Sequence, residues 1–375
     1  MSLIAYQDIP WLEQTWNCVE QKLPYTLKMS QSIDFIPYTA KGTQFLPGPE
    51  GLYWWTNGFW PALLWQMHIA TGEDSYKNAA QQAQSTLSHA FSHSSHLHHD
   101  VGFLYLLSAG INYRLTHDEN SRELVMRAAD FLAGRFNPKG YIRAWNGEDR
   151  AGWAIIDTMM NLPLLYFASF LSKDPRYMHI AKAHAETTLE YFIRPDGSVH
   201  HIVVFDPRDG EALDAPFGQG YEVGSSWSRG QAWALYGFTL CYLNTGEAKY
   251  LQAAKRVAHY FIACTNQDWL PDCDFRAPKE PVVKDNCAGN IAASGLIEIA
   301  KIVPELEKPL YLNAATNLLK AVAKSADFTE SSVFMMQMCT ADYHGQDRHI
   351  PMVYGDYFFV EALQKLRNPQ MISFF

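Results

Sequence analysis

Several features that mark common protein classes are missing from this sequence of 375 residues. Basic residues are outnumbered by acidic ones, and the net charge of −9 leaves no Lys/Arg stripe for a nucleic-acid partner. The six cysteines form no CxxC pair, so neither a zinc knuckle nor a disulfide framework is predicted. A glycine-rich phosphate loop and a GxSxG elbow are also absent, which leaves nucleotide cofactors and serine hydrolase chemistry without support.

The sequence also lacks targeting and linker patterns. No apolar run reaches membrane-spanning length, and the first residues, MSLIAYQDIPWLEQTW, lack a basic region followed by an apolar one. No Pro/Gly/Ser-rich stretch divides the chain. We therefore expect one domain over residues 1–375, in a reduced cytoplasmic protein that has no membrane partner. Assembly into a homo-oligomer stays open.

Apolar and aromatic residues are abundant. Hydrophobic residues make up 48% and charged residues 18%, which predicts a globular protein with a large core. The 11 Trp, 20 Tyr and 21 Phe suit a groove that stacks against ring-shaped ligands, although core packing could absorb most of them.

A helical repeat emerges when the tyrosines are aligned. Four segments place Ala four residues after Tyr, on one helix face: Tyr76/Ala80, Tyr177/Ala181, Tyr250/Ala254 and Tyr311/Ala315. A fifth amphipathic helix starts at Glu119, and a sixth is expected at Trp11–Leu23. In two cases a Thr-Gly-Glu turn precedes the repeat, with glycine as the stop of the preceding helix.

Between these amphipathic segments lie six others that are apolar on nearly every side. They begin at glycine or close to it: 58–72, 101–115, 152–171, 228–246, 287–303 and 354–366. Helices of that kind belong inside a protein. Inner helices that alternate with amphipathic outer ones predict an all-α fold, a closed (α/α)6 barrel. The long connection 194–229 contains VHHIVVFDP and is expected to form a small β-hairpin at the barrel mouth.

Asp157 is the most informative single residue. It is a lone carboxylate in the apolar run GWAIIDTMMNLPLL, where an unpaired charge would be costly. Burial raises the pKa of a carboxyl group, so Asp157 is a candidate proton donor at neutral pH. A buried Asp that only hydrogen-bonds the backbone is the alternative.

Other candidates lie at the starts of the apolar segments. Asp100 precedes VGFLYL and is either an N-cap or a second functional carboxyl. Arg229 and Trp233, at i and i+4, can present a carboxylate-binding fork beside a stacking ring, although Arg229 could instead bridge a buried Asp. Strand alternation turns His200 and His201 to opposite faces, which makes His201 a candidate for substrate contact.

A histidine cluster, His89, His93, His96, His98 and His99, suggests a metal site at first sight. Apart from Asp100, no Cys, Glu or Asp accompanies it at ligand spacing. We therefore expect a polar loop at the barrel mouth, with no metal and no cofactor.

Taken together, these segments resemble the unsaturated glucuronyl hydrolases of glycoside hydrolase family 88, and more distantly the unsaturated rhamnogalacturonyl hydrolases of family 105. The resemblance covers essentially the whole chain. It rests on WWTNGFWPALLW, HHDVGFLY, GWAIIDTMMNLPLL, HHIVVFDP, SSWSRGQAWALYGF and PMVYGDYFFVEAL.

The resemblance implies an (α/α)6 barrel that acts on small oligosaccharides released by polysaccharide lyases, at a terminal uronate with a C4–C5 double bond. It implies that Asp157 is the catalytic acid/base and Asp100 the supporting carboxylate. The implied substrate-binding residues are Trp54, Trp145, His201, Gln219, Arg229 and Trp233. Three alternatives are left: hydration of unsaturated rhamnogalacturonan fragments, a sugar isomerase or epimerase on the same toroid, and a sugar-binding protein without catalysis.

Overall fold

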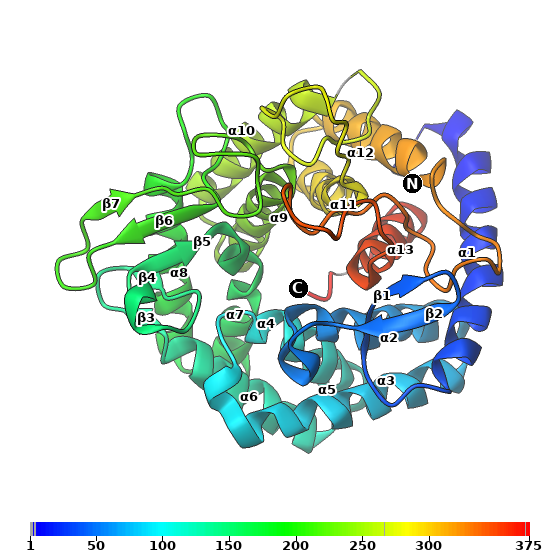
Figure 1. The fold of residues 1–375 in the computed structure, drawn as a ribbon, viewed down its shortest axis with the longest axis horizontal. Helices are drawn as coiled ribbons and strands as arrows, with labels where there is room; N and C mark the ends of the chain where they lie inside the picture. The colour runs from blue at the N-terminus through cyan, green and yellow to red at the C-terminus, as the bar shows by residue number, and fades with distance from the viewer. Residues whose placement is uncertain (1–2, 4, 266, 372) are drawn as a thin grey trace.

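The helices form two concentric layers around a central axis, and the C-terminal residues lie near the middle of the ring (Figure 1). This computed structural model describes residues 3, 5–265, 267–371 and 373–375. The outer layer contains α1 (Ile9–Ser30), α3 (Asp74–Ser88), α6 (Glu119–Ala133), α8 (Pro175–Tyr191), α10 (Ala248–Thr265) and α12 (Lys308–Ala323).

The inner layer alternates with the outer one along the chain. It contains α2 (Phe59–Thr71), α4 (Val101–Tyr105), α5 (Ile111–Thr116), α7 (Leu162–Ser172), α9 (Ser228–Thr245), α11 (Asn286–Ile302) and α13 (Val353–Arg367). A π-helical turn, Leu106–Gly110, joins α4 to α5 into one continuous inner element. The (α/α)6 barrel expected from the sequence is confirmed.

Burial follows the sequence pattern. The four repeat tyrosines, Tyr76, Tyr177, Tyr250 and Tyr311, are each at most 2% exposed. On α9 and α11, runs of consecutive residues are buried on all sides of the helix. The expected glycine stops are present too, since Gly72 and Gly246 follow α2 and α9 with left-handed backbone angles.

The ring closes where its two ends meet. Helix α13 packs against α2 on one side and α11 on the other, and it also contacts α1. Two ion pairs tie α1 and the residue before it to the last hairpin, one between Arg367 and Glu13 at 3.0 Å and one between Lys320 and Asp8.

Close approach between inner elements depends on glycine at two places. A Cβ atom on Gly58 would lie 1.9 Å from the backbone oxygen of Phe103, and one on Gly102 would lie 2.7 Å from the Cα atom of Asn161. Neither position has room for a methyl group, so the segments before α2, α4 and α7 pack backbone against backbone.

Short strands and single helical turns lie before the first helix and in the connections between the helices. The strands are β1 (Pro37–Lys41), β2 (Gln44–Pro47), β3 (Phe136–Asn137), β4 (Tyr141–Ile142), β5 (Trp153–Ile155), β6 (Ile202–Phe205) and β7 (Ala212–Asp214). The short turns are Tyr6–Asp8, Gly51–Tyr53, Trp55–Gly58, His89–His96, Glu148–Arg150 and Ile156–Met160.

The hairpin predicted between residues 194 and 229 is present as β6 and β7, and β5 adds a third antiparallel strand to it. That strand corrects one expectation. Residues 152–161 do not begin an inner helix, because they form β5 and a 3-10 turn, and α7 starts only at Leu162. Among the described residues, no helix is both long and apolar enough to cross a membrane.

The glycine contact yields a stability prediction. Replacement of Gly58 by Ala should lower the free energy of unfolding by about 1–3 kcal/mol, because the backbone of Phe103 must move to admit a methyl group. Gly134→Ala is the matched control, since its Cβ would lie no closer than 3.3 Å to another atom. Urea unfolding of both variants measures the effect, and equal midpoints for Gly58→Ala and the native chain would contradict the packing described above.

Candidate active site

A cavity of about 910 Å³ lies where several inner helices begin. That volume lies within the range of small-molecule sites. Its walls come from the segments before α2, α4 and α7 and from the loops around the β5–β7 sheet. The lining residues are Pro49, Glu50, Tyr53, Trp54, Trp55, Ser95, His96, His98, Asp100, Trp145, Asn146, Arg150, Ile155, Asp157, His201, Gly218 and Gln219.

Asp157 is placed in this wall by the pairing of β5 with β6. Ile155 is opposite Ile202 in the register, and the N–H of Ile156 donates to the carbonyl of His201 at 3.0 Å. The next side chain, Asp157, thereby lies beside His201, with Oδ2 3.4 Å from Nε2. Asp157 is 8% exposed, and its Oδ2 has no hydrogen-bond partner among the described residues. A buried carboxylate oxygen without a partner is typical of a site that receives a ligand.

A hydrogen bond sets the orientation of the His201 ring. The backbone N–H of Gln219 donates to Nδ1 of His201 at 3.1 Å. Because Nδ1 accepts, the neutral ring carries its hydrogen on Nε2, the nitrogen that faces Asp157. His201 therefore directs a donor toward the Asp157 carboxylate.

Asp100 occupies the N-cap position of α4, but its side chain makes no capping hydrogen bond. Instead, Asn161 donates from Nδ2 to Oδ1 of Asp100 at 3.1 Å. Asn161 is held in turn by the N–H of Phe103, which donates to its Oδ1 at 2.8 Å. The carboxyl is thus fixed toward the cavity and does not serve the helix end.

Burial is the main cause of a pKa for Asp100 well above its ordinary value, and the nearby negative charge of Asp157 raises it further. The hydrogen bond from Asn161 acts in the opposite direction. The sequence-based prediction assigned the proton to Asp157 and the charge to Asp100. Burial therefore raises the pKa of Asp100, the residue expected to be the charged partner. Asp157 lies in a 3-10 turn after β5, beside His201 and not inside an apolar helix, and its role as proton donor stays a prediction.

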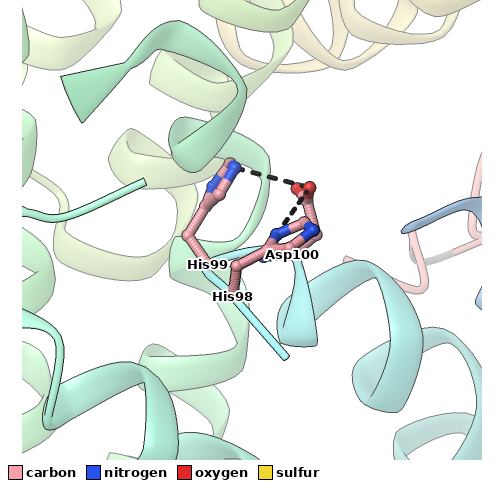
Figure 2. A group of neighbouring side chains, drawn as sticks. All are labelled: His98, His99 and Asp100. Carbon is pink, nitrogen blue, oxygen red and sulfur yellow. Dashed lines mark hydrogen bonds and ion pairs between the residues drawn. The ribbon is translucent and has the colours of Figure 1, made fainter. Parts of the chain in front are cut away.

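Two histidines flank Asp100, His98 in the cavity lining and His99 buried behind it. His98 Nδ1 lies 3.3 Å and His99 Nε2 lies 3.4 Å from Oδ2 of Asp100 (Figure 2). Burial lowers the pKa of His98 to about 4 and that of His99 well below its ordinary value, and the charge of Arg135 adds to both effects. Both rings are therefore neutral at neutral pH. His96 also lines the cavity, whereas His89 and His93 lie outside its lining, so the histidine cluster is only partly the polar mouth loop expected from the sequence.

Arg229 does not present an open fork to the cavity. Its guanidinium is 1% exposed, pairs with Asp285 at 2.5 Å and donates to the carbonyls of Thr340 and Ala341. The alternative left open by the sequence, a buried bridge to an aspartate, is the arrangement observed. Trp233 is fully buried behind the cavity, where its ring packs edge-on against Trp55 at 6.5 Å.

The remaining predicted residues are at the cavity surface. Trp54 lines it with a buried Nε1 that has no partner among the described residues. Trp145 also lines the cavity, and the guanidinium carbon of Arg150 lies 5.6 Å from the centre of its ring. Gln219 donates from Nε2 to the Ala341 carbonyl at 2.8 Å, the same carbonyl that Arg229 contacts.

Sequence reasoning missed several residues that shape the site. Asn161, which orients Asp100, was detectable only as a polar residue four positions after Asp157 in the same apolar run. Glu50, Tyr53, Asn146 and Arg150 lie in loops without periodicity, and only the fold brings them to the cavity.

Comparisons with known proteins show the family to which the chain belongs. The sequence model of Glycosyl Hydrolase Family 88 matches residues 27–363. The chain belongs to this family. It is therefore a glycoside hydrolase, built on an (α/α)6 ring.

Individual relatives cover most of the chain. An unsaturated glucuronyl hydrolase of Bacillus sp. (strain GL1) is 36% identical over 84% of this chain and 86% of its own length. An unsaturated chondroitin disaccharide hydrolase of Streptococcus pyogenes serotype M1 is 33% identical over 82% of this chain and 80% of its own. The crystal structure of an unsaturated glucuronyl hydrolase from Bacillus sp. GL1 superposes with a TM-score of 0.89 at 32% identity, over 95% of this chain and 97% of that one.

The raised pKa of Asp100 makes a prediction about this family 88 chain. A carboxyl group that binds its proton more tightly when folded costs stability as pH rises above its unfolded pKa of about 3.9. Asp100→Asn removes that cost, so its stability relative to the native chain should increase as pH rises above about 4, by at most roughly 1.4 kcal/mol per pH unit.

Thermal unfolding across that pH range measures the difference. Asp34→Asn, at an exposed carboxylate, is the control and should show no such slope. A constant difference between Asp100→Asn and the native chain at every pH would show that Asp100 titrates normally.

Proposed function

We propose that this chain hydrates the C4–C5 double bond of an unsaturated uronate at the non-reducing end of glycosaminoglycan-type oligosaccharides, and so releases that uronate. The observation that carries the proposal is the pair Asp100 and Asp157, two buried carboxyls in the wall of a sugar-sized cavity. The names of the relatives, glucuronyl and chondroitin disaccharide hydrolases, support the substrate class.

The chemistry needs a proton donor for carbon. The C4–C5 double bond together with the ring oxygen is a vinyl ether, and protonation at C4 leaves an oxocarbenium ion at C5. A water molecule adds at C5 and loses a proton, which gives a hemiketal. The hemiketal opens and the glycosidic linkage breaks without displacement at the anomeric carbon. Ordinary glycosidases instead protonate the leaving oxygen and attack the anomeric carbon.

Asp157 is proposed as the acid that protonates C4 and, once ionised, as the base that takes a proton from water. His201, with its Nε2 3.4 Å from Oδ2, would stabilise the ionised form. Asp100, whose pKa is raised by burial and by the charge of Asp157, is proposed as the supporting carboxyl. A bound uronate adds negative charge beside the two carboxyls, which favours the protonated form of the acid that delivers a proton to C4 and then regains one from water.

The other residues bind or position the sugar. Trp54 and Trp145 offer aromatic faces on the cavity wall, and the unpartnered Nε1 of Trp54 can donate to the ligand. His201 and Gln219 are proposed to contact the uronate. Arg229 is proposed as a positioning residue. Its guanidinium and Nε2 of Gln219 both donate to the carbonyl of Ala341. The backbone N–H of Gln219 in turn orients the ring of His201. Trp233 is proposed to support the cavity wall without touching the sugar, by packing against Trp55, which lines the cavity.

Two further expectations remain proposals. Residues 1–375 are proposed to act as one catalytic domain, since the inner ring closes through α13 and α2. A reducing compartment such as the cytoplasm is proposed because all six cysteines are free thiols.

The function is tested by a panel of unsaturated sugars. Incubation with unsaturated chondroitin and hyaluronan disaccharides should abolish the ultraviolet absorbance of the conjugated double bond. An unsaturated rhamnogalacturonan disaccharide, included as the alternative substrate, should react more slowly. A faster reaction of the pectin-derived sugar would favour the family 105 type of activity, and persistent absorbance with every sugar would refute hydration and leave an isomerase or a binding protein.

In the same assay Asp157→Asn should lower kcat on the order of 10²- to 10⁴-fold, because the amide cannot deliver a proton. Binding of the disaccharide, measured calorimetrically, should survive. Asp149→Asn, at an exposed carboxylate near the rim, is the control and should keep native turnover. Native turnover by Asp157→Asn would remove this residue from the mechanism.

A further inference from the structure

His98, His99 and Asp100 are arranged like the ligands of a metal ion. One nitrogen of each imidazole and one oxygen of the carboxylate all lie within 4.8 Å of one another. The two nitrogens approach the same oxygen, at 3.3 Å and 3.4 Å, from two sides (Figure 2). We propose that these three residues bind a zinc-type divalent ion, and that the bound ion inhibits the enzyme.

The distances suit a tetrahedral site. Zinc lies about 2.0–2.1 Å from nitrogen and oxygen ligands, so neighbouring ligand atoms of a tetrahedron are about 3.3–3.4 Å apart. Two of the three ligand separations already have this value. Only small side-chain rotations are needed to bring the three atoms onto one ion.

Hydrogen bonds indicate which ring nitrogens carry the lone pairs. The backbone N–H of Asp100 donates to Nδ1 of His98 at 3.5 Å, so this nitrogen is unprotonated, and a bound ion would replace this long hydrogen bond. His99 Nδ1 lies 3.0 Å from Oγ1 of Thr158. When His99 donates there, its Nε2 carries the lone pair, and this atom is fully buried with no hydrogen-bond partner among the described residues. Metal-binding histidines commonly donate from the other ring nitrogen to a neighbouring acceptor, and the Thr158 hydroxyl can serve as that acceptor here.

The route by which an ion can enter and the charge of nearby residues also affect metal binding at this site. His98 and Asp100 line the cavity, so an ion can enter from the substrate side, and a water molecule can complete its coordination. The positive charge of Arg135 acts on all three residues and opposes a cation. A set of two imidazoles and one carboxylate selects zinc-type ions over magnesium and calcium, which prefer oxygen ligands.

Bound zinc would inhibit for a reason that rests on the proposed function. It would occupy Asp100, the carboxyl proposed to support the reaction, and it would stand in the wall of the cavity that receives the sugar. Zinc binding itself does not depend on the proposed reaction.

Binding is tested without substrate, by competition between the metal-free full-length protein and a chromogenic zinc chelator. We expect uptake of one zinc equivalent by the native chain, and at least tenfold weaker binding by His98→Gln and by His99→Gln. His93→Gln is the matched control, because His93 belongs to the same histidine-rich segment but not to the cluster, and it should bind as the native chain does. Thermal unfolding shows that each variant is folded.

Absence of zinc uptake by the native chain would overturn the proposal, and so would native affinity in the folded His98→Gln and His99→Gln variants. Loss of uptake in His93→Gln would also overturn it, because the ion would then lie elsewhere. In the hydration assay, zinc should inhibit, a chelator should restore activity, and magnesium should have no effect. Unchanged activity at saturating zinc would overturn inhibition, whereas zinc binding by a chain that hydrates no sugar in the panel would count against the proposed function alone.

Discussion

Repulsion between two buried carboxyl groups is the constraint on which the site depends. Asp100 and Asp157 come from different inner segments, and the charge of Asp157 raises the pKa of Asp100. Each carboxyl has a polar neighbour, since Asn161 donates to Asp100 and His201 faces Asp157. Protonation of a carbon atom requires a carboxyl group that can deliver a proton, and Asp157 is proposed to be that group.

Close packing between the inner elements brings the two carboxyls into one wall of the barrel. Backbone contact at Gly58 and Gly102 brings the starts of α2, α4 and α7 together, so that side chains distant in sequence share one wall. The β5–β6 pairing then sets the direction of Asp157. Arg229 lies behind the wall with Asp285, where it anchors the Ala341 carbonyl and, through Gln219, the ring of His201.

The ring of helices could be predicted from the sequence because its signal is periodic. The Tyr–Ala repeat marked outer helices, and the all-round apolar segments marked inner ones, as the burial of Tyr250 and α9 shows. Residues 152–161 were misassigned to a helix, since a short apolar run has the same composition as a strand followed by a turn. Cavity membership of Asp100, Asp157 and His201 followed from motif resemblance. The raised pKa of Asp100 and the partners of Arg229 could not be predicted, because both depend on distances in the folded chain that sequence spacing does not encode.

The most direct test is a carbon-13 NMR titration of the Asp100 carboxyl in the free enzyme. We expect a pKa well above the ordinary aspartate value of about 3.9. In Asp157→Asn this pKa should fall but stay raised, because burial is the larger cause. An Asp100 carboxyl that titrates near 4 in the native chain, with no response to Asp157→Asn, would contradict the coupled pair and the chemistry built on it.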